Sequence, residues 1–257
     1  MSRGLGDVYK RQSIDCDMVS GVAMYQGYDA RAGIEDLPFL FTSAESAHKA
    51  LDGEYGVKLA EEVLEPVGTK VINYWENGMR HFTNDVRPIV TPSDMKGIKF
   101  RSANSPIRIK MFEACNASVV PMQFSELYTA LQQGTVQGQE NPIPLIETSN
   151  FDEVQKYLSL SGHIYNATVL AFNPDKWNSL SPELQEVIIN AANEARDYER
   201  ELNAKESDDA VERLKSKGME VNEVDKSAFV EAVQPVWDTF KKENGSELID
   251  LAVSYND

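Results

Sequence analysis

Short apolar runs alternate along the chain with longer segments in which apolar residues recur every three or four positions. The short runs are typical of buried strands, and the wider spacing is typical of amphipathic helices. We expect strands near residues 15–22, 70–75, 98–101, 118–121, 168–172 and 219–224. We expect helices near residues 44–64, 106–114, 125–134, 154–158 and 229–240. This alternation predicts an α/β fold.

Glycine, proline and capping residues punctuate this pattern. Asn77 and Gly78 predict a turn at the end of the strand that begins at residue 70. Ser125 is expected to cap the helix that follows it. Pro142 and Pro144 are expected to interrupt the backbone after a polar segment.

The longest periodic segment begins at Ser181 and Pro182, a pair typical of the N-cap and first position of a helix. Apolar residues keep helical spacing to Leu202, and a weaker pattern continues to Gly218. The segment predicts a helix of thirty residues or more. A helix of this length without heptads either kinks or bridges two lobes, and we favour the bridge.

The composition is that of a globular protein, but its charge is strongly negative. The 257 residues are 42% hydrophobic, and 25 Lys and Arg oppose 41 Asp and Glu, giving a net charge of −16. This field repels nucleic acid and anionic lipid. A site for an anionic ligand must therefore depend on a few local cations.

Metal and cofactor chemistry find little support in the sequence. Cys16 and Cys115 lie far apart without zinc-ligand spacing, and we expect two buried free thiols rather than a disulfide. His48, His81 and His163 form no metal-binding motif. We expect no metal, no cofactor and, without an apolar run of about 18 residues, no membrane insertion.

Four runs in the middle of the chain form a distinctive series. They are GMRHFTN at 78–84, TPSDMKGIKFR at 91–101, PMQFSELYTALQQGTVQGQENP at 121–142 and EVQKYLSLSGHIY at 153–165. In this order and spacing they resemble the substrate-binding proteins of tripartite ATP-independent periplasmic (TRAP) transporters, a family that includes dicarboxylate-binding proteins. One departure is Gln137, where the family commonly has aspartate, so a role for that aspartate is not carried over.

The resemblance implies a periplasmic-binding-protein-like fold of two α/β lobes joined by hinge strands and a long bridging helix. Lobe 1 is expected to comprise residues 13–77 and 167–207, and lobe 2 residues 78–166 and 208–257. Residues 1–12 lack periodicity and are expected to be a non-native junction. The family's signal peptide and first strand and helix have no counterpart before residue 13, so the first lobe is expected to be truncated and incomplete.

Arg101 is the first candidate ligand-binding residue. It ends a predicted strand, where open α/β sheets present ligand contacts, and its planar fork matches a carboxylate. The resemblance places it at the position of the family's carboxylate-binding arginine. Arg80 resembles a second basic residue facing the cleft; its alternative role is a salt bridge between lobes.

Other candidates are weaker when taken alone. Asn141 offers donor and acceptor amide atoms in a predicted turn, and the resemblance implies that it contacts ligand. Phe124, Trp75, Tyr165 and Asn166 are expected to line the pocket, although such aromatic positions also suit a plain core.

Paired carboxylates could instead indicate an acid–base enzyme. Glu126 fits better as a helix N-terminal residue, Glu140 as the partner of a basic neighbour and His163 as a structural histidine. No nucleophile accompanies them, and we expect no enzyme activity.

The resemblance therefore implies a monomeric, extracytoplasmic (periplasmic) receptor that delivers a small organic carboxylate to TRAP membrane subunits. Sugar acids, C4-dicarboxylates, other organic acids and sialic acid all remain open as ligands. The alternatives are a binding protein of an ABC transporter or sensor and, less favoured, an acid–base enzyme.

Overall fold

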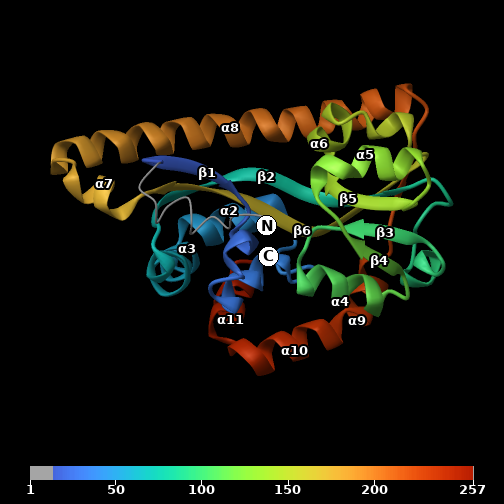
Figure 1. The fold of residues 1–257 in the computed structure, drawn as a ribbon, viewed down its shortest axis with the longest axis horizontal. Helices are drawn as coiled ribbons and strands as arrows, with labels where there is room; N and C mark the ends of the chain where they lie inside the picture. Colours follow the sequence, from blue (N-terminus) through green and yellow to red (C-terminus); the bar gives the residue numbers. More distant parts are fainter. Residues whose placement is uncertain (1–13, 257) are drawn as a thin grey trace.

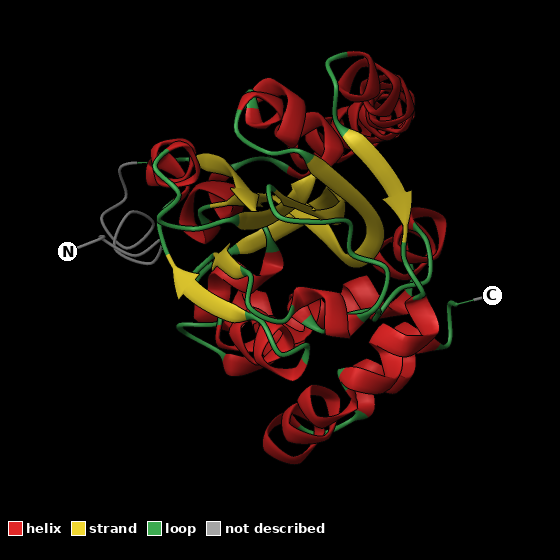
Figure 2. Ribbon diagram, turned by 90° about the vertical axis from the view of Figure 1, so that its right-hand side faces the viewer, coloured by secondary structure: helices red, strands yellow, loops and turns green. Residues whose placement is uncertain are grey.

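The computed structural model describes residues 14–256 of the chain, and the predicted junction at residues 1–12 lies outside them. A central sheet lies between helices on both sides (Figure 2). Helix α8 (Pro182–Ser216) runs along one side for the length of the molecule, and α9 (Lys226–Ala232), α10 (Gln234–Asn244) and α11 (Glu247–Val253) lie on the other (Figure 1).

The sheet has seven strands in the described residues, in the order β1-β6-β2-β5-β3-β4, with β7 also paired to β6. Pairs β1/β6, β6/β2 and β2/β5 are antiparallel, whereas β5/β3, β3/β4 and β6/β7 are parallel. The strands are β1 (Cys16–Ser20), β2 (Lys70–Asn84), β3 (Lys99–Ser102), β4 (Ser118–Pro121), β5 (Gly138–Pro142), β6 (Tyr157–Phe172) and β7 (Glu220–Glu223). The predicted mixed α/β class is confirmed.

The remaining helices are shorter than α8. They are α2 (Ala44–Asp52), α3 (Glu54–Leu59), α4 (Pro106–Ala114), α5 (Phe124–Gln132), α6 (Ile143–Thr148) and α7 (Pro174–Ser179). Short 3₁₀ segments occupy Val22–Tyr25, Ala30–Asp36, Glu65–Val67, Pro92–Met95 and Phe151–Glu153, and a π-turn occupies Ala60–Leu64. The single helix predicted at 44–64 is therefore divided, because Gly53 has an extended backbone between α2 and α3.

The predicted turn at Asn77 and Gly78 is wrong. Strand β2 continues through both residues, and Asn77 is an extra residue between the pairs Glu76↔Ala167 and Gly78↔Asn166. Gly78 has a φ of 119°, which costs glycine little, so the chain forms a bulge without leaving the ladder.

Three further expectations for the middle of the chain are wrong. Asn141, expected in a turn, lies in the buried strand β5, which Pro142 ends, and Pro144 lies in the first turn of α6, where no amide donor is needed. Leu158, expected in a helix, lies in β6 and pairs with both β2 and β7. Gln123, rather than Ser125, caps α5.

The long helix is confirmed. Ser181 caps α8 by accepting a hydrogen bond from the Leu184 amide at 3.4 Å, and the helix has 35 residues, which corresponds to about 50 Å. Its first half packs beside β2 and its second half against α6 and β7. Among the helices of residues 14–256, none combines the length and apolar character needed to cross a bilayer.

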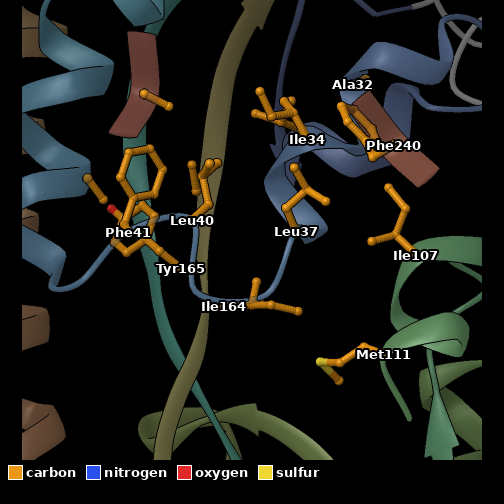
Figure 3. Packing of buried hydrophobic residues seen from close by; sticks show 14 of the residues in the cluster. Ala32, Ile34, Leu37, Leu40, Phe41, Ile107, Met111, Ile164, Tyr165 and Phe240 are labelled. Carbon is orange, nitrogen blue, oxygen red and sulfur yellow. The ribbon is translucent and has the colours of Figure 1, made fainter. Parts of the chain in front are cut away.

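Buried apolar side chains form two clusters. The larger lies around β2, β6, α4 and the C-terminal helices, and in Figure 3 Phe41 and Tyr165 lie next to each other within it. The smaller lies beneath α5, α6 and the end of α8. Both cysteines are free, and Cys115 is buried as expected, but Cys16 is exposed because it starts the edge strand β1.

Gly138 allows β5 to approach β3 closely. A Cβ at this position would lie 2.5 Å from Phe100 Cε1 and 2.8 Å from the Thr83 carbonyl oxygen. We expect Gly138→Ala to lower the free energy of unfolding by about 1–3 kcal/mol, the usual cost of overpacking. Denaturant titration measures this loss, with Gly27→Ala, whose added Cβ meets nothing within 4 Å, as the control. Equal stability of the two variants would contradict the prediction.

Candidate functional site

Arg101 lies near the end of β3, beside β5, and only 4% of its surface is exposed. Its Nε donates a hydrogen bond to the Met122 carbonyl oxygen at 3.0 Å. Its Cζ lies 5.9 Å from the centre of the Phe124 ring. The structure therefore brings Arg101 and Phe124 together, as expected.

The charge of Arg101 has no protein counter-ion. Within residues 14–256, no carboxylate oxygen lies within 4.0 Å of its guanidinium nitrogens, whereas Arg80, Arg108 and Arg200 each have such a partner. Burial lowers the pKa of Arg101 to about 10; the charge of Glu140 opposes this shift at longer range, and Arg80 and Arg108 add to it. The guanidinium remains protonated at neutral pH, so among the described residues a buried cation is left without an anion in direct contact.

Arg80, in contrast, is fully engaged with the protein. Its Nε and Nη2 hold the Glu140 carboxylate in a two-pronged ion pair, with 3.0 Å between Nη2 and Oε1. Nη2 also donates to Asn141 Oδ1 at 2.8 Å, and Nη1 donates to Asn166 Oδ1 at 3.2 Å. Arg80 and Glu140 both lie in the range expected for lobe 2, so this is a salt bridge within that range rather than the expected one between lobes, and among the described residues one Nη1 hydrogen has no partner.

Glu140 also binds a second arginine. Arg108, from α4, donates to Glu140 Oε1 at 3.3 Å and to Asp36 Oδ1 at 2.7 Å. Burial alone would raise the pKa of Glu140, but Arg80 and Arg108 together outweigh it and hold that pKa well below its usual range. Glu140 is therefore a charged structural anion, paired with basic side chains as expected.

The two histidines of this region, the buried His163 and the half-buried His81, are neutral structural residues. His163 stacks on Phe82 with 4.0 Å between ring centres, and its Nε2 lies 3.4 Å from Glu140 Oε2. Burial lowers the pKa of His163 and lowers that of His81 to about 3. Neither is charged at neutral pH. Glu126, the other candidate acid, accepts the Gln123 amide at the start of α5.

A series of buried side-chain hydrogen bonds holds the Asn141 amide in place. Asn141 Nδ2 donates to Gln139 Oε1 at 2.5 Å, and Gln139 Nε2 donates to Thr83 Oγ1 at 2.9 Å. Thr83 in turn donates to Gln155 Oε1 at 2.9 Å. With Arg80 on its oxygen, the orientation of the Asn141 amide is fixed.

Asn166 joins Arg80 to a carboxylate that the sequence did not single out. Its Oδ1 accepts from Arg80 and, at 2.7 Å, from Asn77 Nδ2, while its Nδ2 donates to Glu35 Oε2 at 2.9 Å. Burial raises the pKa of Glu35 to about 7, with Asp36 adding to the increase. The network thus contains one carboxyl group that titrates near neutral pH.

The three aromatic candidates have different surroundings. Phe124 is 42% exposed at the start of α5 and can cover a ligand held by Arg101. Trp75 donates to Asn73 Oδ1, and Asn73 contacts Asn193 of α8, so Trp75 lies outside the Arg80 network. Tyr165 is buried edge-on against Phe41 and His48 in the hydrophobic core (Figure 3).

Sequence reasoning missed Glu35, Asp36, Arg108 and Gln139. Glu35 and Asp36 stand directly before the apolar run LPFLF, and two acids entering such a run are a signal of buried, partnered carboxylates. Arg108 lies between two isoleucines in α4, a comparable signal. In residues 14–256 no group of three or more His, Cys, Asp or Glu side chains is arranged to hold a metal ion.

The α/β fold, with a buried arginine that no carboxylate of the described residues contacts, is the arrangement expected of a protein that binds small anions. The more particular assignment comes from comparison with known proteins. The family of bacterial extracellular solute-binding proteins, family 7 (DctP), matches residues 7–244, and the chain belongs to this family.

Characterised relatives support the same assignment. The chain is 40% identical over 241 residues to the 2,3-diketo-L-gulonate-binding periplasmic protein YiaO of Escherichia coli K12, covering 92% of this chain and 73% of the relative. A TRAP periplasmic solute-binding protein from Polaromonas sp. JS666, solved with D-erythronate, superposes with a TM-score of 0.90 at 36% identity, over 96% of this chain and 82% of that one. A second from Sulfitobacter sp. NAS-14.1, solved with β-D-galacturonate, gives 0.91 at 31% identity, over 97% and 83%. The resemblance to TRAP solute-binding proteins is confirmed.

The buried Glu140 ion pairs make a strong prediction for stability. Glu140→Gln leaves Arg80 and Arg108 without their shared anion, and breaking a buried pair in this way costs about 3–5 kcal/mol of unfolding free energy. The control is Glu147→Gln, which removes a similar two-pronged pair with the half-exposed Arg213 and should cost less than about 1 kcal/mol. Urea unfolding at pH 7 compares the two, and losses of equal size would refute the structural role of Glu140.

Proposed function

We propose that this protein is a non-enzymatic receptor that binds a small organic carboxylate through Arg101. The observation that carries the proposal is the buried Arg101 guanidinium without a carboxylate partner among residues 14–256. An unpaired buried charge is costly, and a ligand carboxylate supplies the missing anion.

The geometry of arginine suits this role. With Nε occupied by Met122, the two terminal nitrogens can donate parallel hydrogen bonds to the two oxygens of one carboxylate. The low dielectric of a buried site strengthens this pairing against the repulsion of a chain whose net charge is −16. Phe124 would cover the ligand from the solvent side.

Asn141 and Asn166 extend the proposed site away from Arg101. Arg80 fixes both amide oxygens, so it acts mainly as a positioning cation, with one remaining Nη1 hydrogen available to a ligand hydroxyl. The amides are held in place before binding, which reduces the entropy lost when they contact a ligand. Tyr165 and Trp75 have core or α8-facing surroundings and are not included among the proposed contacts.

The ligands of related proteins support a sugar acid as the class of ligand. YiaO is named for binding 2,3-diketo-L-gulonate, and the two solved relatives hold D-erythronate and β-D-galacturonate. We propose that this chain likewise works in the periplasm as a monomer and delivers its ligand to TRAP membrane subunits. Ligand would lie between lobes with the boundaries predicted from the sequence.

The candidate acid–base residues support binding without turnover. Glu140 is committed to two arginines, Glu126 caps a helix, and His163 is a buried neutral histidine. Neither Glu140 nor His163 is poised to exchange a proton with a ligand near pH 7.

Replacing Arg101 tests the proposed function. Removing one member of a buried, hydrogen-bonded charge pair costs about 2–5 kcal/mol, and each ~1.4 kcal/mol is tenfold in Kd, so Arg101→Ala should weaken binding at least ~30-fold. Arg101→Lys keeps the charge but loses the fork and should also bind poorly. Calorimetric titration with erythronate, galactonate and galacturonate measures the effect.

Arg213→Ala is the matched control, because it removes the same charge from an exposed position on α8. It should bind as tightly as the wild type. Wild-type affinity in Arg101→Ala would remove Arg101 from the site, and chemically altered ligand recovered after long incubation would disprove the receptor function.

A further inference from the structure

Glu35 is a second buried charge that lacks an opposite partner. It is the next-to-last residue of the 3₁₀ segment Ala30–Asp36 and is 7% exposed. Its Oε2 accepts from the Ala23 amide at 3.0 Å and from Asn166 at 2.9 Å, and its Oε1 accepts from the Ala167 amide at 2.9 Å. In residues 14–256, no cationic nitrogen lies within 4.0 Å of it.

Glu35 and Arg101 stand at opposite ends of one polar band. From Glu35 the band passes through Asn166 on β6 and Arg80 on β2 to Asn141 on β5, and Arg101 lies on the next strand, β3. These four strands are neighbours in the sheet (Figure 1). The band therefore has a cationic end and an anionic end, with amide groups between them.

Gly21 lies directly against the anionic end. A Cβ on Gly21 would lie 3.0 Å from Glu35 Oε2 and 3.0 Å from Asn166 Nδ2, tighter than ordinary side-chain contacts. The backbone φ of 104° at this position also favours glycine. The absence of a side chain here leaves the Glu35 carboxylate and the Asn166 amide uncovered by this residue.

We propose that Glu35 makes the receptor selective for hydroxylated monocarboxylates, such as sugar acids, over dicarboxylates of the same length. This inference rests on the proposed function, in which Arg101 holds the ligand's carboxylate. A hydroxyl at the far end of the ligand donates a hydrogen bond to the Glu35 carboxylate, whereas a second ligand carboxylate meets a like charge in a poorly solvated place. Selectivity thus comes from repulsion of the wrong ligand as well as from contact with the right one.

The pKa of Glu35 determines the pH at which the experiment should be done. Burial, followed by the nearby Asp36, raises its pKa to about 7, while the Ala23 and Ala167 amides and Arg108 oppose the increase. Glu35 is therefore mostly ionised at pH 8.5 and mostly neutral at pH 6.5. The charged and titratable groups around it are Asp36 of its own segment, Arg108 of α4, Arg80 of β2, and the hydroxyls of Tyr55, Tyr74 and Tyr165.

The experiment compares ligand pairs of equal carbon number by calorimetric titration at pH 8.5. The pairs are D-erythronate with succinate, and galactonate with adipate. For the pair whose length suits the site, the wild type should bind the hydroxylated acid at least ~10-fold more tightly than the dicarboxylate. The reason is that a like-charge contact costs more than ~1.4 kcal/mol. Glu35→Gln should reduce this preference at least ~10-fold, chiefly by improving dicarboxylate binding.

Glu76→Gln is the matched control, because it removes one negative charge from a glutamate that binds His48 outside the band. It should keep the wild-type preference. A measurement without substitution guards against misfolding of Glu35→Gln: in the wild type, lowering the pH from 8.5 to 6.5 should reduce the preference at least ~5-fold, since neutral Glu35 no longer repels a carboxylate.

The outcomes separate this inference from the proposed function. If the acids bind and Arg101→Ala weakens them, but neither Glu35→Gln nor the pH change alters the preference, only the role of Glu35 is overturned. A wild type that prefers the dicarboxylate overturns it as well. If no acid of either pair binds the wild type, both proposals fail together.

Discussion

The carboxylate of Glu140 is the interaction on which the centre of the molecule depends. It binds Arg80 of β2 and Arg108 of α4, and Arg108 also forms an ion pair with Asp36. Three parts of the chain that are distant in sequence thus meet at one buried anion. Because each of these charges is costly when buried alone, none can be placed without the others. The ion pairs therefore require the middle strands, α4 and the Ala30–Asp36 segment to assemble together.

The same cluster determines which charge remains for a ligand. Arg80 and Arg108 are balanced by Glu140 and Asp36, so this part of the interior is close to neutral. Arg101 lies beside the cluster and is not included in the balance. A ligand at the proposed site would therefore meet the Arg101 guanidinium next to ion pairs whose charges cancel. In this way a strongly acidic protein could hold an anion. The amides of Asn141 and Asn166 gain their fixed orientation from the same arginine that neutralises Glu140.

The elements predicted correctly from the sequence are those whose ends and periodicity are determined by neighbouring residues. Helix α8 followed from its cap and apolar period, and α4 and β4 had clear boundaries. Strand β5 was missed and β6 was predicted only over residues 168–172, because the pairing of both strands with β2 is non-local and leaves no mark in the local sequence. Arg101 could be proposed from a strand end and a planar fork. The role proposed for Glu35 could not be predicted, because it depends on a hydrogen bond with Asn166, 131 positions away.

The register shifts between β2 and β6 give the molecule an uneven stiffness. The ladder changes register between Val71 and Asn73, between Glu76 and Gly78, and between Arg80 and Phe82. At each shift the ladder of backbone hydrogen bonds is interrupted, so the two strands bend there more easily than elsewhere. Arg80 borders the third shift. The ion pair between Arg80 and Glu140 thus lies beside one of the interruptions of the ladder, and a change in that pair would act on the pairing of β2 and β6 at this place.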